Sequence, residues 1–205
     1  MSIFILVISL ILDSFVTSIA YGSDNIKIPN SSIILINFIS ALMLTLAILF
    51  GMSLMNFIPT GLPNKISFII FFSLGLYKLF EVLIKKYFKK FSLHKKPLTF
   101  KAFDMKFALN VYIDEKSADF DKSKAISLKE SVYLSLALSL DSLAVGIGIS
   151  FMQINYVLLI VLCFILGVLS FKFGILLGKK LVSKREINLS WLSGLILLLI
   201  SFTKL

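Results

Sequence analysis

Long apolar runs, each about the length of a membrane span, dominate the pattern of hydrophobic and polar positions along this chain. Each run predicts a helix, because about 20 helical residues are needed to cross the hydrocarbon core of a bilayer. We expect these helices at residues 2–21, 31–55, 66–84, 130–150, 156–177 and 188–202. Pro, Gly and Asn cluster in the short links at 22–30 and 56–65, which is typical of turns. The sequence therefore predicts an all-α membrane protein with six transmembrane helices.

Positive charge is concentrated in two of the links between these runs. Of the 21 lysines and arginines, 12 lie at 85–129 and 4 lie at 179–185. Cytoplasmic loops of membrane proteins carry such an excess of cations. We therefore predict a multi-pass protein whose 85–129 loop is cytoplasmic and whose two termini are both outside. The expected partners are the lipid bilayer and its anionic headgroups, and not nucleic acid, although the net charge is +10.

The first and fourth runs contain related motifs that each open with an aspartate and a serine. Asp13-Ser14 and Asp141-Ser142 lie 128 positions apart, and small residues follow each pair at four-residue spacing. Weaker matches at offsets of 127 and 126 relate the second run to the fifth and the third to the sixth. Because each repeat has an odd number of spans, the second must enter the membrane from the opposite side. We predict two inverted three-helix repeats, 1–84 and 130–205.

The two aspartates are the strongest candidates for function, because a carboxylate within a lipid-spanning helix costs roughly 2.5–3.5 kcal/mol. Both lie near the middle of their runs, and close packing of the small residues that follow would bring the first and fourth spans together. Neighbouring hydroxyl and amide groups complete a set of oxygen ligands suited to Mn²⁺, Mg²⁺ or Ca²⁺. The predicted ligands are Asp13, Asp141, Ser14, Ser142, Thr17 and Asn37. The alternative is that the aspartates are protonated, or bonded to serine hydroxyls, and only lock the helices together.

Two lysines, Lys78 and Lys172, also lie within apolar runs. Each is close enough to a predicted cytoplasmic helix end for its side chain to reach the interface, and we favour this snorkelling interpretation. A second hypothesis makes Lys172 the counter-ion of one aspartate. Glu81 can pair with Lys78 or Lys85 at helical spacing, and we expect no further role for it.

Residues 119–130 have the spacing of an EF-hand calcium loop. The candidate calcium ligands are Asp119, Asp121, Ser123 and Glu130. Position 6 of such a loop is normally Gly, because its φ is positive, but here it is Lys124. Two interpretations stay open: a Ca²⁺ site, or a degenerate loop in which Ser127 and Glu130 form a capping box for the fourth helix.

Catalysis has little support in this sequence. Cys163 is the single cysteine, which excludes an internal disulfide and a thiolate metal cluster. The single histidine, His94, lies outside the apolar runs, so no Ser–His or Cys–His pair is available within them. We therefore do not expect an enzyme.

Taken together, the Asp-Ser motifs, the Gly-Leu-Tyr-Lys-Leu sequence at 75–79 and the calcium-loop-like stretch resemble the YtaF-type sporulation membrane proteins. That group is a branch of the MntP-like manganese exporters, within the lysine-exporter superfamily. The resemblance covers essentially the whole chain. It implies six spans in two repeats, a bacterial cell membrane, endospore formation, and cation handling by Asp13 and Asp141.

We therefore expect a divalent-cation exporter with Mn²⁺ as its substrate, in which one repeat rocks against the other. The alternative is a non-transporting sporulation protein that acts as a scaffold or sensor through its 85–129 loop. A homo-oligomer is compatible with both hypotheses.

Overall fold

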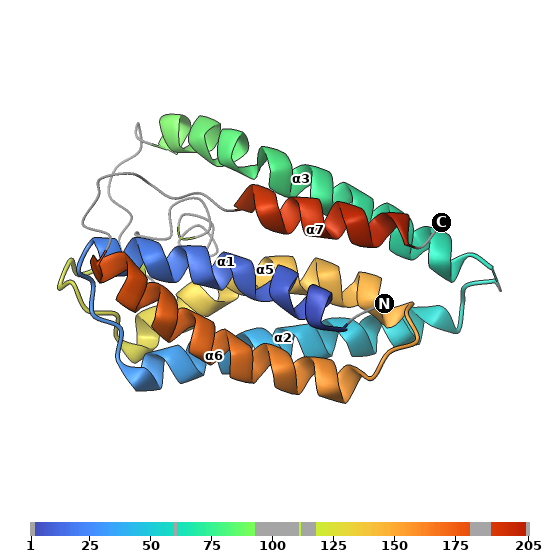
Figure 1. Ribbon diagram of the computed structural model, residues 1–205, viewed down its shortest axis with the longest axis horizontal. Helices are drawn as coiled ribbons and strands as arrows, with labels where there is room; N and C mark the ends of the chain where they lie inside the picture. Colours follow the sequence, from blue (N-terminus) through green and yellow to red (C-terminus); the bar gives the residue numbers. More distant parts are fainter. Residues whose placement is uncertain (1–2, 60, 93–110, 112–117, 181–189, 204–205) are drawn as a thin grey trace.

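The computed structural model describes residues 3–59, 61–92, 111, 118–180 and 190–203, and its regular elements within these ranges are helices (Figure 1). In chain order they are α1 (Ile3–Ser23), α2 (Asn30–Met55), α3 (Pro63–Ser92), α5 (Leu128–Ser150), α6 (Tyr156–Lys180) and α7 (Ser190–Phe202). The predicted all-α fold class is confirmed. Residues 93–110 and 112–117 of the predicted cytoplasmic loop, and the cations Lys184 and Arg185, lie outside the described residues.

Large apolar side chains cover the outside of the bundle. Phe38, Leu46, Leu169 and Phe173 are each more than half exposed, and all four come from long apolar helices. Water would solvate such a surface poorly, whereas lipid matches it. Within the described residues α1, α2, α5 and α6 are long and apolar enough to cross a membrane, and the apolar stretch of α7 is shorter. The chain is therefore a helical membrane protein.

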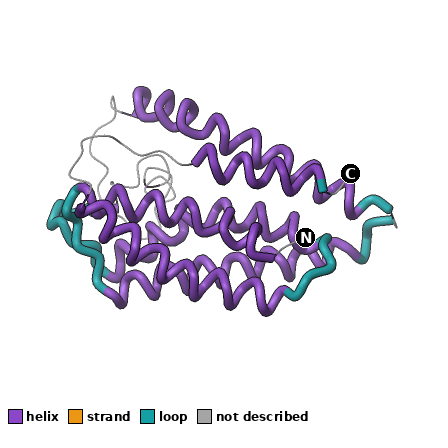
Figure 2. The backbone as a smooth tube through the Cα atoms, viewed as in Figure 1, coloured by secondary structure: helices purple, strands orange, loops and turns teal. Residues whose placement is uncertain are grey.

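Helices from the two halves of the chain pack in pairs, α2 against α5, α1 against α6 and α3 against α7. Smaller contacts join α1 to α7, α3 to α5, α2 to α6 and α1 to α5. The loops between helices gather at the two ends of the bundle (Figure 2). This set of contacts is symmetric. If α1 is exchanged with α5, α2 with α6 and α3 with α7, the same set of helix pairs is obtained.

Small residues make the closest helix contacts possible. Ser18 of α1 lies against Gly174 of α6, and Ser150 of α5 lies against Gly51 of α2. A Cβ atom at either glycine would overlap the facing serine hydroxyl. The small-residue stripes after the two aspartates are thus packing surfaces, as expected. The prediction that these stripes join the first span to the fourth is wrong, because they pack on α6 and α2, and the direct contact between α1 and α5 is small.

The segment before α5 is fastened to the link between α1 and α2. The Lys27 N–H donates to the Lys124 carbonyl over 2.8 Å, and the Ile126 N–H donates to the Lys27 carbonyl over 2.9 Å. The Ser32 hydroxyl donates to the Ile126 carbonyl over 3.2 Å. Ile126 is buried in an apolar cluster with residues of α1, α2, α5 and α6. This anchorage positions the calcium-loop-like stretch at one end of the bundle.

Candidate cation site

Four helices contribute one polar side chain each to a buried centre. Asp13 comes from α1, Lys78 from α3, Asp141 from α5 and Ser193 from α7. The Lys78 ammonium donates to Oδ2 of Asp13 and, over 2.6 Å, to Oδ2 of Asp141. The Ser193 hydroxyl donates to Oδ1 of Asp13 over 3.4 Å. The two aspartates singled out in the sequence therefore meet, and a lysine joins them.

Lys78 was not found by sequence reasoning, and its snorkelling interpretation is wrong. Its side chain is 2% exposed, and the side chains of the two aspartates are each 16% exposed. A lone ammonium would be very costly in such a place, so the lysine and the carboxylates stabilise one another. The sequence hypothesis named Lys172 as a counter-ion, but the lysine that pairs with the two aspartates is Lys78. Two acids within apolar spans indicate that a polar partner lies nearby, but they do not identify it.

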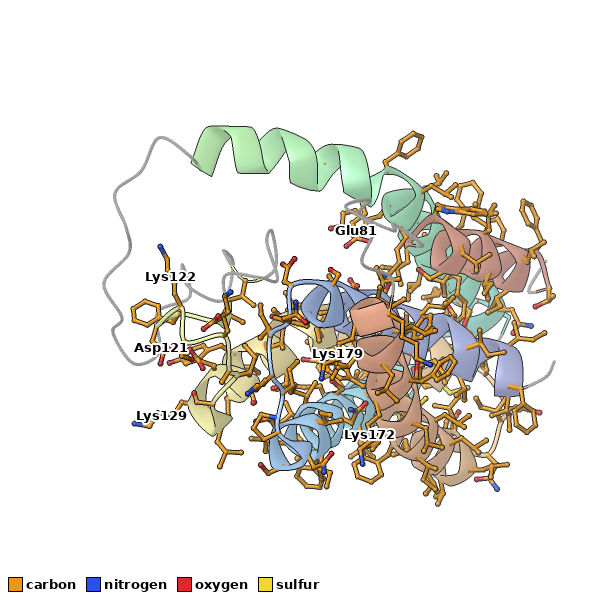
Figure 3. The ribbon with its side chains drawn as sticks, turned by 60° about the vertical axis from the view of Figure 1, so that its left-hand side comes forward. Glu81, Asp121, Lys122, Lys129, Lys172 and Lys179 are labelled. Carbon is orange, nitrogen blue, oxygen red and sulfur yellow. The ribbon has the colours of Figure 1, made fainter. Side chains whose placement is uncertain are left out.

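Glu81 adds a third carboxylate next to this centre. It lies three residues after Lys78 on α3, is 3% exposed, and interacts electrostatically with both Lys78 and Asp13. Figure 3 shows it on the side of α3 that faces α1. Three carboxylates and one ammonium carry a formal charge of two negative units when all are ionised. The centre is therefore suited to one further divalent cation.

A small cavity lies between α1, α2, α5 and α6. Its volume is about 30 Å³, enough for one water molecule or one small ion. The predicted ligands Ser14, Asn37 and Ser142 line it, together with Cys163. Asp13 and Asp141 are not among its lining residues. Each serine thus faces the cavity while the aspartate before it faces Lys78, which divides the predicted ligand set between two places.

Thr17 and Asn37 are the remaining predicted ligands whose positions can be compared with the cavity. Thr17 is buried on α1 and does not line the cavity. The side-chain amide of Asn37 donates to the Ile33 carbonyl of its own helix over 2.9 Å.

Three carboxylates converge in the calcium-loop-like stretch. One oxygen from each of Asp119, Asp121 and Glu130 lies within 4.8 Å of the others. Oδ1 of Asp119 is buried without a hydrogen-bond partner among the described residues, and Oδ2 accepts from the Lys124 N–H over 3.1 Å. Desolvation raises the pKa of Asp119 above its ordinary value. A cation at this point would therefore relieve both the desolvation and the crowding of negative charge.

One backbone feature of this stretch agrees with an EF-hand loop. Lys124 has a φ of +58°, so it adopts the left-handed conformation normally supplied by Gly. The fourth predicted ligand, Ser123, donates its hydroxyl to the Ala125 carbonyl over 3.0 Å. Lys124 therefore adopts the backbone conformation expected at position 6, although it is not Gly.

Glu130 also serves the start of α5. Its Oε2 accepts from the Ser127 N–H over 2.8 Å, and the Ser127 hydroxyl accepts from the Glu130 N–H over 3.3 Å. This is the capping box that the degenerate-loop interpretation predicted as the alternative to a Ca²⁺ site. Oε1 of Glu130 accepts from the Phe120 N–H over 2.8 Å, so the glutamate ties the first residues of the loop to the helix.

Comparison with known proteins supports the resemblance drawn from the motifs. Residues 105–205 match a family described as "Putative manganese efflux pump". The chain is 29% identical over 206 residues to the "Probable sporulation protein YtaF" of Bacillus subtilis, which covers 100% of this chain and 98% of that protein. It is 28% identical over 209 residues to the "Putative manganese efflux pump MntP" of Methanosphaera stadtmanae, covering 98% of this chain and 96% of that one. No solved structure matches it significantly. The chain is therefore similar over nearly its whole length to these two proteins, and its second half matches the family described as "Putative manganese efflux pump".

Proposed function

We propose that this protein exports divalent cations, with Mn²⁺ as its substrate, and that Asp13 and Asp141 hold the cation in the middle of the membrane. One observation carries the proposal. Carboxylates from corresponding positions of the two halves meet at a buried centre among apolar helices. Acids in such places are costly and are typical of ion pathways. Carboxylate oxygens suit Mn²⁺, and two related proteins carry names linked to manganese efflux or sporulation.

The proposal includes two inverted repeats that rock against each other. Equivalent residues of the two halves make equivalent contacts. Ser18 of the first half packs on Gly174 of the second half. The corresponding pair is Gly146, 128 positions after Ser18, and Ala47, 127 positions before Gly174, and these two residues also pack together. In this proposal the 85–129 loop is cytoplasmic and both termini are outside a bacterial cell membrane, in agreement with the distribution of positive charge along the sequence. Rocking would expose the aspartates to each side in turn.

Transport into proteoliposomes tests the ligand assignment. Wild type should move Mn²⁺, and Asp13→Asn or Asp141→Asn should lower the initial rate by about tenfold or more, because an amide keeps the shape but removes the charge. The exposed Asp24 in the α1–α2 link provides a matched control, and Asp24→Asn should transport as wild type does. Wild type without any divalent flux would instead favour a non-transporting sporulation scaffold or sensor.

We also propose that residues 119–130 hold a resident Ca²⁺ ion. Asp119, Asp121 and Glu130 supply carboxylates that hard cations prefer, and the buried Oδ1 of Asp119 has capacity for one more contact. The loop is hydrogen-bonded to the α1–α2 link through Lys27. A bound ion would therefore stiffen the attachment between the start of α5 and the first two helices.

A further inference from the structure

We infer that Lys78 is a tethered cation that occupies the Asp13–Asp141 site when no substrate is bound, and that the transported divalent cation binds by displacing it. This inference rests on the proposed function. It extends that function by stating what stabilises the empty carrier and why the ion that replaces the lysine carries two charges.

The position of the ammonium carries the first step. Lys78 Nζ bonds to Oδ2 of both aspartates, so it occupies the point from which one ion could bind both carboxylates. Metal ions bind carboxylate oxygens at distances of about 2.0–2.6 Å. The distance from the Lys78 ammonium to Oδ2 of Asp141 is 2.6 Å, so a metal ion would lie at least as close to that oxygen. The lysine and a bridging metal ion therefore cannot occupy the same oxygens together, and their binding is competitive.

The need for a cation at this point carries the second step. Asp13 and Asp141 are largely buried, and two carboxylates that share one buried site repel each other strongly. When the empty carrier switches between its outward-open and inward-open states, this charge would have to pass through a low-dielectric interior. Lys78 offsets one of the two aspartate charges, so the unloaded protein returns with less uncompensated charge than it would without the lysine.

Glu81 gives the displaced ammonium a place to go. It lies on the same face of α3 at i, i+3 spacing, is 3% exposed, and already interacts electrostatically with Lys78. With the lysine turned to Glu81 and a divalent cation between the aspartates, the charges of the whole centre cancel. A monovalent cation would leave one negative charge buried, so the arrangement selects divalent ions.

Lys172 offers a matched control for any change at Lys78. It is also a lysine inside an apolar helix, but in the described part of the chain its ammonium makes no ion pair. Figure 3 shows it on α6, apart from Glu81 on α3. Removal of its charge should leave the aspartate centre unchanged.

The test compares wild type, Lys78→Gln and Lys172→Gln in proteoliposomes by two fluxes and one binding measurement. Net Mn²⁺ flux requires the empty carrier to return, whereas Mn²⁺ counterflow does not. For Lys78→Gln we expect about tenfold tighter Mn²⁺ binding, retained counterflow, and net flux lowered by about tenfold or more. Lys172→Gln should match wild type in all three.

Several results would overturn the inference. One is a Lys78→Gln protein with wild-type affinity and an unchanged ratio of net flux to counterflow. Another is loss of both fluxes with unchanged or weaker Mn²⁺ binding, which indicates a structural role. If Lys78→Gln does not fold without metal, purification in Mn²⁺ should recover it, and failure to do so also counts against the idea. If wild type shows no Mn²⁺ flux, the proposed transport function is contradicted. The inference about Lys78 would still be supported in that case if Lys78→Gln binds Mn²⁺ more tightly than wild type, because this indicates that the lysine and the ion compete.

Discussion

Lys78, Asp13 and Asp141 form a unit because none of them is tolerated alone in the interior. Removal of one partner from a buried ion pair typically costs about 3–5 kcal/mol, since the remaining charge is left without compensation. The carboxylates of Asp119, Asp121 and Glu130 gather negative charge without a salt bridge among the described residues. The first group contains its own cation, and in our proposal the second takes one from solution.

Calcium binding to the loop can be tested at a single exposed residue. Ca²⁺ should raise the melting temperature of the purified wild-type protein, and Asp121→Asn should remove most of this rise because one carboxylate ligand is lost. Thermal melting with and without Ca²⁺ measures both. Lys122→Gln, which changes charge in the same loop without removing a carboxylate, should keep the response. An equal response from Asp121→Asn and wild type would show that this loop does not bind the ion.

At the scale of helices, contact depends on residues without bulk. Gly174 allows α6 to approach α1 so closely that the Ser18 hydroxyl and the Phe15 carbonyl fill the space of a missing side chain. Without a hydrophobic driving force between helices in lipid, van der Waals contact of this kind is a main source of association. Small residues along α1 and α5 therefore fix which helices become neighbours.

Gly174→Ala should destabilise the bundle by about 1–3 kcal/mol, because the new methyl group overlaps atoms of α1. Melting temperatures in detergent provide the measurement. Ser18→Gly in the same protein should restore part of the loss by removing the overlapping side chain. Leu176→Ala, on the exposed face of α6, is the control and should have little effect. Gly174→Ala with wild-type stability would mean that α1 and α6 are not in this close contact.

At the scale of the whole molecule, the two ends of the described chain lie at the same end of the bundle (Figure 1). The α1–α2 link lies beside the segment that precedes α5, because backbone hydrogen bonds join Lys27 to that segment. This arrangement requires an even number of crossings between the ends. It is compatible with the predicted topology, in which both termini are outside and the joined loops are cytoplasmic.

Cysteine labelling tests this topology. In a Cys163→Ala background, a single cysteine at exposed Lys27 should react with a membrane-impermeant maleimide only in opened cells. A single cysteine at exposed Gln153, in the α5–α6 link, should react in intact cells. Labelling of both positions from the same side would contradict the inverted arrangement of the two halves.

Local pattern was sufficient for much of this protein. The apolar runs located the helices, because helix formation and burial in lipid depend on residues close together in the chain. The capping box of Ser127 and Glu130 was likewise predictable, since its partners are three residues apart. Asp13 and Asp141 were identified because a carboxylate is costly wherever it lies in an apolar span.

Only the tertiary structure decided which side of each helix faces which neighbour. Helices such as α2 and α6 are apolar on all sides, so their sequences contain no signal for the face that packs inward. Lys78 lies on α3 and Ser14 on α1, and their neighbours come from helices that are distant in the chain. The sequence therefore did not show that Lys78 contacts both aspartates, or that Ser14 lines a cavity that Asp13 does not line. The sequence by itself determined where the helices and the buried acids lie along the chain, and the packing of distant helices decided which cation the acids meet.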